Sequence, residues 1–369
     1  MIRPGPEPGH FVAQQRIWHS VVSNVPHVVF LIFILLSTLS ASTVTGVAFW
    51  SWLALVVFDE ILPRVKSLPE IAVEHSADAM LSDVMVKKAG VLLFILFVIA
   101  QTALGSDANL SGREFVLLCL TTGFLGAIFA IPIAHELMHS RCRNDRRWAV
   151  AIMAMFSYPH FCLEHIHGHH RGVGTYNDPA TARLGESIYA FLRRALVRSF
   201  VNSWKREITR LRIKRRSKFS IANRIFCYFS IVIVIHFFVM TLFGLQGALF
   251  FLIQGTTGIM TLESINYIEH YGLQRNRTER GSYEPVSRDH SWNSSHFLTN
   301  LLLFDLARHS DHHINPGRHF RSLALRREAP QLPVGYFGIL WLTLLPPLWR
   351  QLMDVRVQQK LGKYTCPVR

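Results

Sequence analysis

The sequence predicts an all-α integral membrane protein with six transmembrane helices and a histidine-rich cap on one side of the membrane. Half of the 369 residues are hydrophobic and only 17% are charged, which is typical of a chain that lies largely in lipid. Long apolar runs alternate with polar segments, and these polar segments hold most of the 39 Lys and Arg residues. Four histidine-rich motifs lie in or next to the polar segments.

Six apolar runs mark the expected membrane helices. A helix rises 1.5 Å per residue, so about 20 apolar residues cross the hydrocarbon core. The expected helices are 26–42, 44–62, 89–105, 115–134, 222–243 and 245–266, with a tight connection at 40–46. Four other segments are expected on the membrane surface or packed against the bundle: 63–88, 148–158, the basic amphipathic segment 187–218, and 333–348.

The distribution of basic residues gives the expected orientation. With both termini on one side, that side holds 37 of the 39 Lys and Arg residues, while Arg113 is the one basic residue of the outer loops. Basic residues mark cytoplasmic loops, so both termini and all four histidine motifs are expected on the cytoplasmic side of a bacterial-type inner membrane. This also explains the net charge of +15 without a nucleic-acid partner. The expected division is a cytoplasmic arm at 1–25, the membrane domain with its cap at 26–357, and a tail at 358–369.

The cysteines argue against a disulfide framework or a thiolate metal site. The five cysteines are scattered, and no CxxC pair occurs. The sequence also lacks a dinucleotide-binding fingerprint, so no bound nucleotide is expected. Any electrons that the protein uses are therefore expected to come from a separate protein.

The histidine motifs predict a metal centre with two ions. They read HELMH at 135–139, EHIHGHH at 164–170, NYIEHYG at 266–272 and RHSDHH at 308–313. Histidine is the commonest metal ligand, and residues four apart share a helix face, so we expect His165 and His169 on one face with His170 beside them. His167 points away. The nine candidate ligands, too many for one ion, are His135, His139, His165, His169, His170, His270, His309, His312 and His313.

Two alternatives and the choice of metal remain open from the residues alone. HELMH matches the HExxH motif of zinc metalloproteases, with Glu136 as general base, but such a site needs one further ligand and not seven. A solvated or pH-sensing histidine patch is the other alternative. Imidazole suits zinc, copper, iron and nickel. Several imidazoles per ion without thiolate, in a membrane rich in hydrocarbon chains, favour a redox metal that activates oxygen.

Further residues are candidates for supporting roles. Metal-bound imidazoles usually donate their second N–H to a carboxylate or carbonyl. Acidic residues near the motifs are therefore candidate partners of the ligands, with helix-surface charges as the alternative: Glu136, Glu164, Asp178, Glu269 and Asp311. Trp50 and Trp52 are candidate lining residues of a hydrocarbon channel, with aromatic residues of the membrane interface as the alternative.

The four motifs, in this order on a six-span scaffold, resemble those of the membrane-bound non-haem diiron alkane monooxygenases, to which the xylene and cymene methyl monooxygenases are related. The segments NDPATARLGESIYAF, DHSWNSSHFLTNLLLF and HINPGRHFRSLALRREAPQLPVGYFGILWLTLLPPLWRQLMD also look like the alkane enzymes. The resemblance covers about residues 44–357. It implies that the nine histidines hold two iron ions and that O2 is a co-substrate.

The resemblance implies an activity and partners as well. The expected reaction is hydroxylation of the terminal methyl group of a medium- or long-chain n-alkane that enters from the bilayer lipid. Rubredoxin or ferredoxin, with an NAD(P)H-dependent reductase, would supply electrons. Aryl-methyl hydroxylation and fatty-acyl desaturation or decarboxylation are the alternatives that the same irons would support.

Overall fold

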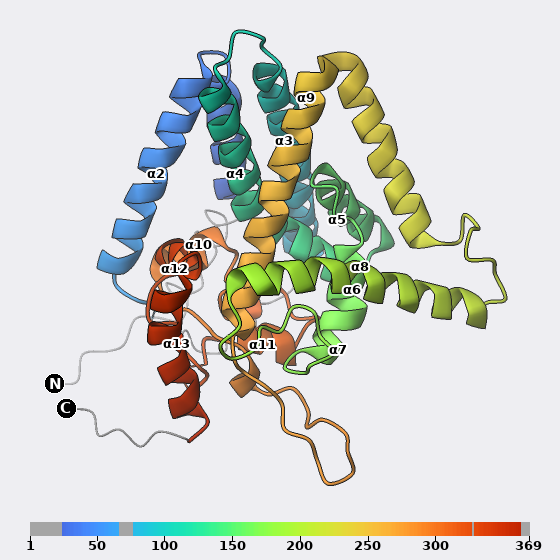
Figure 1. Ribbon diagram of the computed structural model, residues 1–369, viewed down its shortest axis with the longest axis vertical. Coiled ribbons are helices and arrows are strands. Elements are labelled where there is room, and N and C mark those ends of the chain that lie inside the picture. Colours follow the sequence, from blue (N-terminus) through green and yellow to red (C-terminus); the bar gives the residue numbers. More distant parts are fainter. Residues whose placement is uncertain (1–23, 66–76, 327, 363–369) are drawn as a thin grey trace.

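The computed structural model describes residues 24–65, 77–326 and 328–362. Within these ranges the regular structure is helical, apart from isolated bridges that join Arg277 to Tyr283 and Asn293 to Gln331. Figure 1 shows long helices side by side in a bundle, with short helices gathered below one end of it. The all-α fold predicted from the sequence is confirmed for the described residues.

The bundle is built from the apolar runs. Its helices are an unlabelled one at Asn24–Leu36, then α2 (Ala41–Ile61), α3 (Ala77–Gly105), α4 (Gly112–His139) and α9 (Arg224–His270). Four of them contain apolar segments long enough to cross a membrane: Ala41–Ile61, Val86–Gly105, Gly112–His139 and Arg224–His270. The chain therefore has the long apolar helices of a membrane protein.

Polar caps set the helix starts, and they correct some expected boundaries. The side chain of Ser40 accepts a hydrogen bond from Thr43 N, so α2 starts at Ala41 and the preceding turn lies at 37–39, earlier than the expected 40–46. Ser111 and Glu114 form a capping box at the start of α4. α3 already starts at Ala77, so the last part of the expected surface segment 63–88 belongs to a membrane helix.

Helix α9 consists of two arms. Gly244 has φ 65° and ψ −168°, a conformation that favours glycine and interrupts the helix between residues 243 and 245. The arms fold back on each other (Figure 1). His236 of the first arm contacts Phe251 of the second, with ring centroids 5.1 Å apart. The two separate helices expected at 222–243 and 245–266 correspond to these arms.

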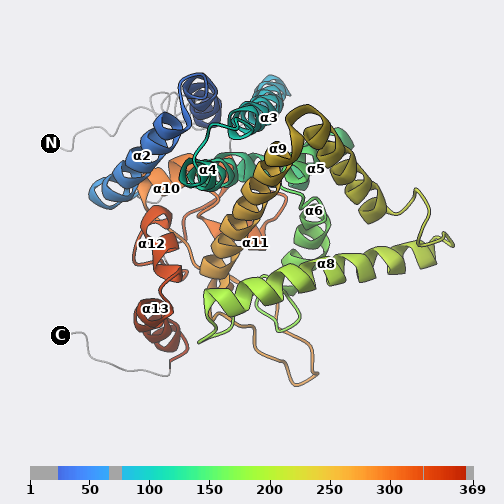
Figure 2. The ribbon, with the colours of Figure 1, turned by 45° about the horizontal axis from the view of Figure 1, so that its top comes forward.

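The short helices form the cap, which Figure 2 shows from another direction. They are α5 (Arg143–Met155), α6 (Phe161–Glu164), the π-helix η1 (His165–His169), α7 (His170–Gly172), α10 (Phe297–Leu302), α11 (His309–Ile314), α12 (Tyr336–Thr343), α13 (Pro346–Lys360), and the 3-10 helices η2 (Arg288–His290) and η3 (Phe320–Ser322). The long helix α8 (Ile188–Ile213) runs across the bundle beside α9.

Close packing of α4 on α9 positions the metal centre. These two helices share the most extensive contact between elements of the described structure. At Gly123 of α4, a Cβ atom would overlap the backbone oxygen of Gln254 in α9, so only glycine allows this approach. Phenylalanine rings fill the neighbouring core, among them Phe94 and Phe156, which stack with centroids 5.3 Å apart. The ends of α4 and α9 therefore bring His135, His139 and His270 to the same region of the cap.

Candidate metal centre

The structure brings the nine predicted histidines together below the ends of α4 and α9. They form two groups, in each of which the nearest ring nitrogens all lie within 4.8 Å of one another. The first group has five members: His135, His139, His165, His170 and His312. The second has four: His169, His270, His309 and His313.

In the five-histidine group the Nε2 atoms face one point. His170 Nε2 lies 3.1 Å from His139 Nε2, 3.0 Å from His165 Nε2 and 3.1 Å from His312 Nε2. His135 completes the group, with its ring centroid 4.4 Å from that of His312. The rings of His139 and His170 are partly exposed, whereas the other three are buried.

The four-histidine group is buried throughout. His309 Nε2 lies 3.1 Å from His270 Nε2 and 3.0 Å from His313 Nε2. The His169 ring lies 4.7 Å from that of His270 and 4.8 Å from that of His313, centroid to centroid. All four residues are at most 4% exposed, so this group has no edge on the protein surface.

A π-helical turn directs ligands that are close in the sequence to different groups. An α-helical spacing predicts His165 and His169 on one helix face, but η1 contains five residues in a π turn, and His165 instead shares its group with His170. A Cβ at Gly168 would overlap the carboxylate of Glu164, so a larger residue there would have to displace that side chain. The wider turn explains why the α-helical spacing gave the wrong neighbour.

The C-terminal motif divides its ligands in a similar way. On α11, His309 and His313 are four residues apart and share the four-histidine group, as an α-helix requires. His312 lies on the adjacent face and belongs to the five-histidine group. Thus His312 and His313, like His169 and His170, are consecutive residues that serve different groups.

The nitrogen geometry fits metal ions. Two nitrogens bound to one metal at about 2.1 Å, with an angle of about 90° between them, lie about 3 Å apart. The Nε2 separations of 3.0–3.1 Å in both groups match this value. The Nε2 atom of His169 and both ring nitrogens of His135 are buried without a hydrogen-bond partner, which is costly unless a metal ion takes that place.

The cap keeps the imidazoles neutral, which is the form that binds metals. Burial, reinforced by neighbouring imidazoles, holds the pKa of five ligands in η1, α7 and α11 well below the ordinary value of about 6.5. These ligands are His165, His170, His309, His312 and His313. At neutral pH no proton has to leave before a metal binds.

Two of the predicted carboxylates contact the four-histidine group. His169 Nδ1 lies 2.9 Å from Asp178 Oδ2, and the hydroxyl of Thr181 donates to the same oxygen at 2.6 Å. Burial raises the pKa of Asp178, but the His169 ring and these hydrogen bonds outweigh it and leave the pKa below its ordinary value. The carboxylate therefore accepts the Nδ1 proton of His169 and turns its Nε2 atom toward the group.

Glu269 occupies a different position from the one expected. Its Oε2 atom lies 3.2 Å from Nε2 of His309, the nitrogen that faces the other ligands. Its Oε1 atom accepts a hydrogen bond of 3.0 Å from the hydroxyl of Tyr336. Glu269 thus adds an oxygen at the front of the four-histidine group. Tyr336 was not among the predicted residues, because nothing in its local sequence points to a metal centre.

The remaining predicted carboxylates bind other partners. Glu164 accepts a hydrogen bond from Ser203, and Asp311 binds Arg318 and the backbone N–H of Ala324. Glu136 lies 3.5 Å from Lys87 Nζ. A zinc protease would need the Glu136 carboxylate beside the metal, so this arrangement argues against the protease alternative.

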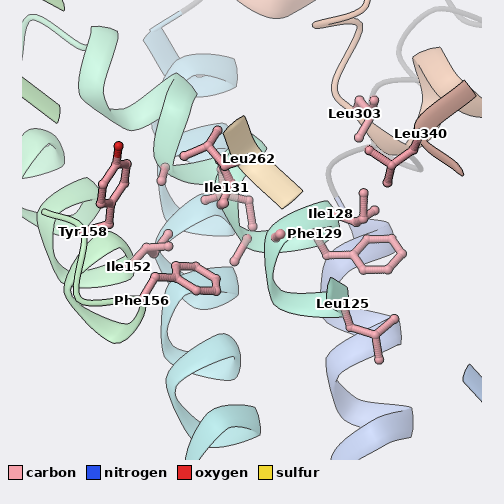
Figure 3. Close-up of a cluster of buried hydrophobic side chains, with 14 of the residues drawn as sticks. Leu125, Ile128, Phe129, Ile131, Ile152, Phe156, Tyr158, Leu262, Leu303 and Leu340 are labelled. Carbon is pink, nitrogen blue, oxygen red and sulfur yellow. The ribbon is translucent and has the colours of Figure 1, made fainter. Parts of the chain in front are cut away.

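An apolar cavity ends at the ligands. Figure 3 shows buried side chains of this region, among them Ile128 and Ile131 of α4 and Leu262 of α9. The cavity is lined by Ala127, Ile128, Ile131, Pro132, His135, Phe161, His165, Thr261, Leu262, Ile265, Asn266, Glu269, Leu303, Leu306, Ala307 and His309. Ligands of both groups therefore face the same small, mostly apolar space.

The two predicted tryptophans do not line this cavity. Trp50 is 66% exposed on the outside of α2. Trp52 is partly buried and packs edge-on against Phe124, Phe337 and Trp341.

Comparison with known proteins places the chain in a family. The model of the fatty acid desaturase family matches residues 112–343. Alkane 1-monooxygenase 2 of Alcanivorax borkumensis is 38% identical over 268 residues, which are 73% of this chain and 70% of that protein. An alkane 1-monooxygenase of Pseudomonas putida is 35% identical over 321 residues, 85% of this chain and 79% of the relative. The chain belongs to the alkane 1-monooxygenase family.

A more distant relative belongs to the aryl-methyl enzymes. The hydroxylase component of a xylene/toluene monooxygenase from Pseudomonas putida is 27% identical over 311 residues, 83% of this chain and 82% of the relative. Membership of the alkane 1-monooxygenase family and the two imidazole groups together indicate a non-haem iron site in a membrane enzyme. They also imply a hydrocarbon substrate and a redox partner.

Proposed function

We propose that the protein is an alkane 1-monooxygenase that hydroxylates the terminal methyl group of a medium- or long-chain n-alkane. The observation that carries the proposal is the convergence of nine imidazoles, in two groups, at the end of an apolar cavity between α4 and α9. The similarity to several alkane 1-monooxygenases, at 35–41% identity, supports the same reaction.

The nine histidines would hold two iron ions, one in each group. The irons would supply the activation of O2, with two electrons from a donor and two protons, so that one oxygen atom enters the alcohol and the other leaves as water. The protein's part is to hold and orient. Asp178 fixes the tautomer and direction of the His169 ring, and the π turn at His165–His169 sends adjacent ligands to different groups.

The cavity would position the substrate. Its apolar lining excludes water and accepts an alkyl chain, whose methyl end would lie beside His135, His165 and His309. The methyl group would then be close to both irons. Holding a C–H bond in a dry, fixed place supplies much of the rate advantage of such a site and protects the oxidant from side reactions.

The electron donor would bind at the five-histidine group. His139 and His170 are partly exposed there, and exposed basic side chains lie near them along the chain, among them Arg141, Arg146 and Arg171. An acidic rubredoxin, or a ferredoxin, with its NAD(P)H-dependent reductase suits this charge. Its binding should weaken as ionic strength rises.

For the topology we propose six spans, formed by the apolar segment that ends at Leu36, α2, α3, α4 and the two arms of α9. Both termini and the metal centre would lie on the cytoplasmic side of a bacterial-type inner membrane, within a domain that extends over 26–357. The concentration of Lys and Arg in the segments on that side supports this orientation.

A thiol-labelling experiment tests the orientation. Cys142 is exposed next to the cap. In a Cys366→Ser background, a membrane-impermeant maleimide should label Cys142 in inside-out vesicles and leave it unlabelled in intact spheroplasts. Labelling in spheroplasts would place the cap on the outer side and refute the proposed topology.

A product assay tests the reaction. Membranes with the iron-loaded protein, NADH, rubredoxin and its reductase are offered octane, hexadecane, p-xylene and a fatty acid in parallel. We expect 1-octanol or 1-hexadecanol, with product formation reduced on the order of 100-fold or more in the His313→Ala variant. An aryl alcohol from p-xylene alone would support the aryl-methyl alternative, to which the xylene/toluene relative points. Formation of an alkene from the fatty acid, with no alcohol, would refute the hydroxylase.

A further inference from the structure

The end of α2 carries two adjacent carboxylates, Asp59 and Glu60, that contact the cap. Asp59 is only 1% exposed, although it belongs to an apolar helix. A buried carboxylate destabilises the folded protein unless it is well hydrogen-bonded. Ionisable groups retained in membrane helices usually serve a function. The partners of Asp59 therefore indicate what this residue does.

Asp59 orients the hydroxyl of Thr299. The backbone N–H of Thr299 donates to Asp59 Oδ1 at 2.9 Å, and its hydroxyl donates to Asp59 Oδ2 at 2.5 Å. Because the hydroxyl proton points at Asp59, the oxygen is left as an acceptor, and it accepts the N–H of Tyr336 at 3.0 Å. Asp59 and Thr299 together therefore hold the first residue of α12.

The start of α12 is in close contact with these carboxylates. A Cβ atom at Gly335 would overlap Asp59 Oδ2, so the backbone of α12 lies directly against the carboxylate. The N–H of Gly335 donates to Glu60 Oε1 at 2.7 Å. Both contacts fix the position at which the Tyr336 side chain leaves the backbone.

Tyr336 connects this junction to the metal centre. Its ring is 2% exposed, and its hydroxyl donates to Glu269 Oε1. The other oxygen of Glu269 lies 3.2 Å from His309 Nε2. Loss of the Tyr336 hydrogen bond would free the carboxylate to rotate away from the front of the four-histidine group.

We infer that Asp59 is a positioning residue for the metal centre: from the end of α2 it fixes the start of α12, and through Tyr336 it holds the Glu269 carboxylate against the inward-facing nitrogen of His309. This inference rests on the proposed diiron site. The competing explanation is a purely structural role, in which Asp59 joins α2 to the cap and does not influence Glu269.

The experiment compares single and double variants of the full chain, purified and loaded with ferrous iron. Asp59→Asn replaces one acceptor oxygen by an NH2 group that faces a donor, while Tyr336→Phe removes the hydroxyl that binds Glu269. Glu60→Gln is the matched control, because it removes the neighbouring negative charge but keeps an oxygen that can accept the hydrogen bond from the N–H of Gly335. The readouts are the Mössbauer spectrum without O2 or alkane, the iron content, the melting temperature and kcat.

We expect Asp59→Asn and Tyr336→Phe to change the spectrum of one iron in the same way. We also expect kcat to fall on the order of 10-fold or more in each, as is usual for groups that orient metal ligands. Because both residues act through one contact, the double variant should show no further change in spectrum or kcat. Glu60→Gln should keep the wild-type spectrum.

Two results would overturn the inference: a wild-type spectrum in Asp59→Asn, or additive losses in the double variant. If Asp59→Asn fails to fold, Thr299→Val carries the test, since it removes the bridging hydroxyl and keeps the Thr299 N–H bond to Asp59. The spectrum requires no substrate. A protein that oxidises no alkane, yet shows the shared spectral change, would refute the proposed function and leave the role of Asp59 intact.

Discussion

The two histidine groups differ in their distance from the protein surface and in their neighbours. The five-histidine group has two partly exposed rings, His139 and His170, and lies among exposed arginines. The four-histidine group is buried, and two carboxylates, Asp178 and Glu269, contact its members. A site with one accessible metal and one enclosed metal can separate its tasks. We expect electrons to enter at the first group and the enclosed group to depend more on its neighbours.

The largest expected effect comes from removing one ligand from each group. His313→Ala leaves three imidazoles in the four-histidine group, and we expect iron to fall from about two to about one per chain, with activity reduced on the order of 100-fold or more. His170→Ala leaves four imidazoles in its group, so both irons should remain, with weaker binding of one. Iron analysis of the purified variants checks this. Equal iron loss in both variants would show that the groups do not differ.

The next largest effect concerns the carboxylate that supports the enclosed group. Asp178→Asn weakens the hydrogen bond to His169 Nδ1, and we expect the affinity for one iron to drop by about 10- to 100-fold. Chelator competition, which follows the release of each iron, measures the change. Thr181→Val, which removes a hydrogen bond to Asp178 and keeps the carboxylate, is the control and should show a smaller effect. Faster release from the five-histidine group would contradict the assignment.

Acid should destabilise the iron-free and the iron-loaded protein to a similar extent. The ligand imidazoles of the cap have lowered pKa values, so the unfolded chain binds more protons below about pH 6.5, and folding stability is lost as the pH falls from there. Because the folded ligands are neutral with or without iron, bound iron should raise the melting temperature by a similar amount at both pH values. Melting temperatures at pH 7 and pH 5, with and without iron, measure the difference. A much smaller pH dependence of the iron-loaded form would contradict this account.

His160 provides the control for acid sensitivity. This buried histidine belongs to neither group, and burial lowers its pKa to about 4. Between pH 7 and pH 5, protonation of His160 in the unfolded chain lowers the free energy of unfolding by about 2 kcal/mol, with or without iron. His160→Phe should remove this loss from the iron-free and the iron-loaded protein and leave the effect of iron on the melting temperature unchanged.

The smallest expected effect tests electron entry at the exposed group. Arg171 is exposed beside His170, and Arg171→Glu should raise the KM for rubredoxin several-fold at low salt, with the difference fading at high salt. Steady-state kinetics at two ionic strengths measure it. Arg280→Glu makes the same charge change elsewhere on the cap surface. An equal effect of the two variants would mean that only net charge matters.

The sequence was enough to predict the ligands and much of the fold, but not which histidine belongs to which group. The apolar runs were enough to predict both arms of α9, because run length acts locally. The division of the histidines depends on the π turn, which an α-helical spacing of His165 and His169 does not anticipate. Tyr336 and Asp59 reach the centre through hydrogen bonds between distant segments, and no local pattern marks such contacts.

Consecutive residues serve different groups at two places, His169–His170 and His312–His313. One peptide unit holds neighbouring Cα atoms 3.8 Å apart, and this length does not change as side chains move. Two such covalent spacers would therefore tie two bound ions together, so that neither could shift far without pulling the other. We expect the separation of the two groups to stay nearly constant through the catalytic cycle.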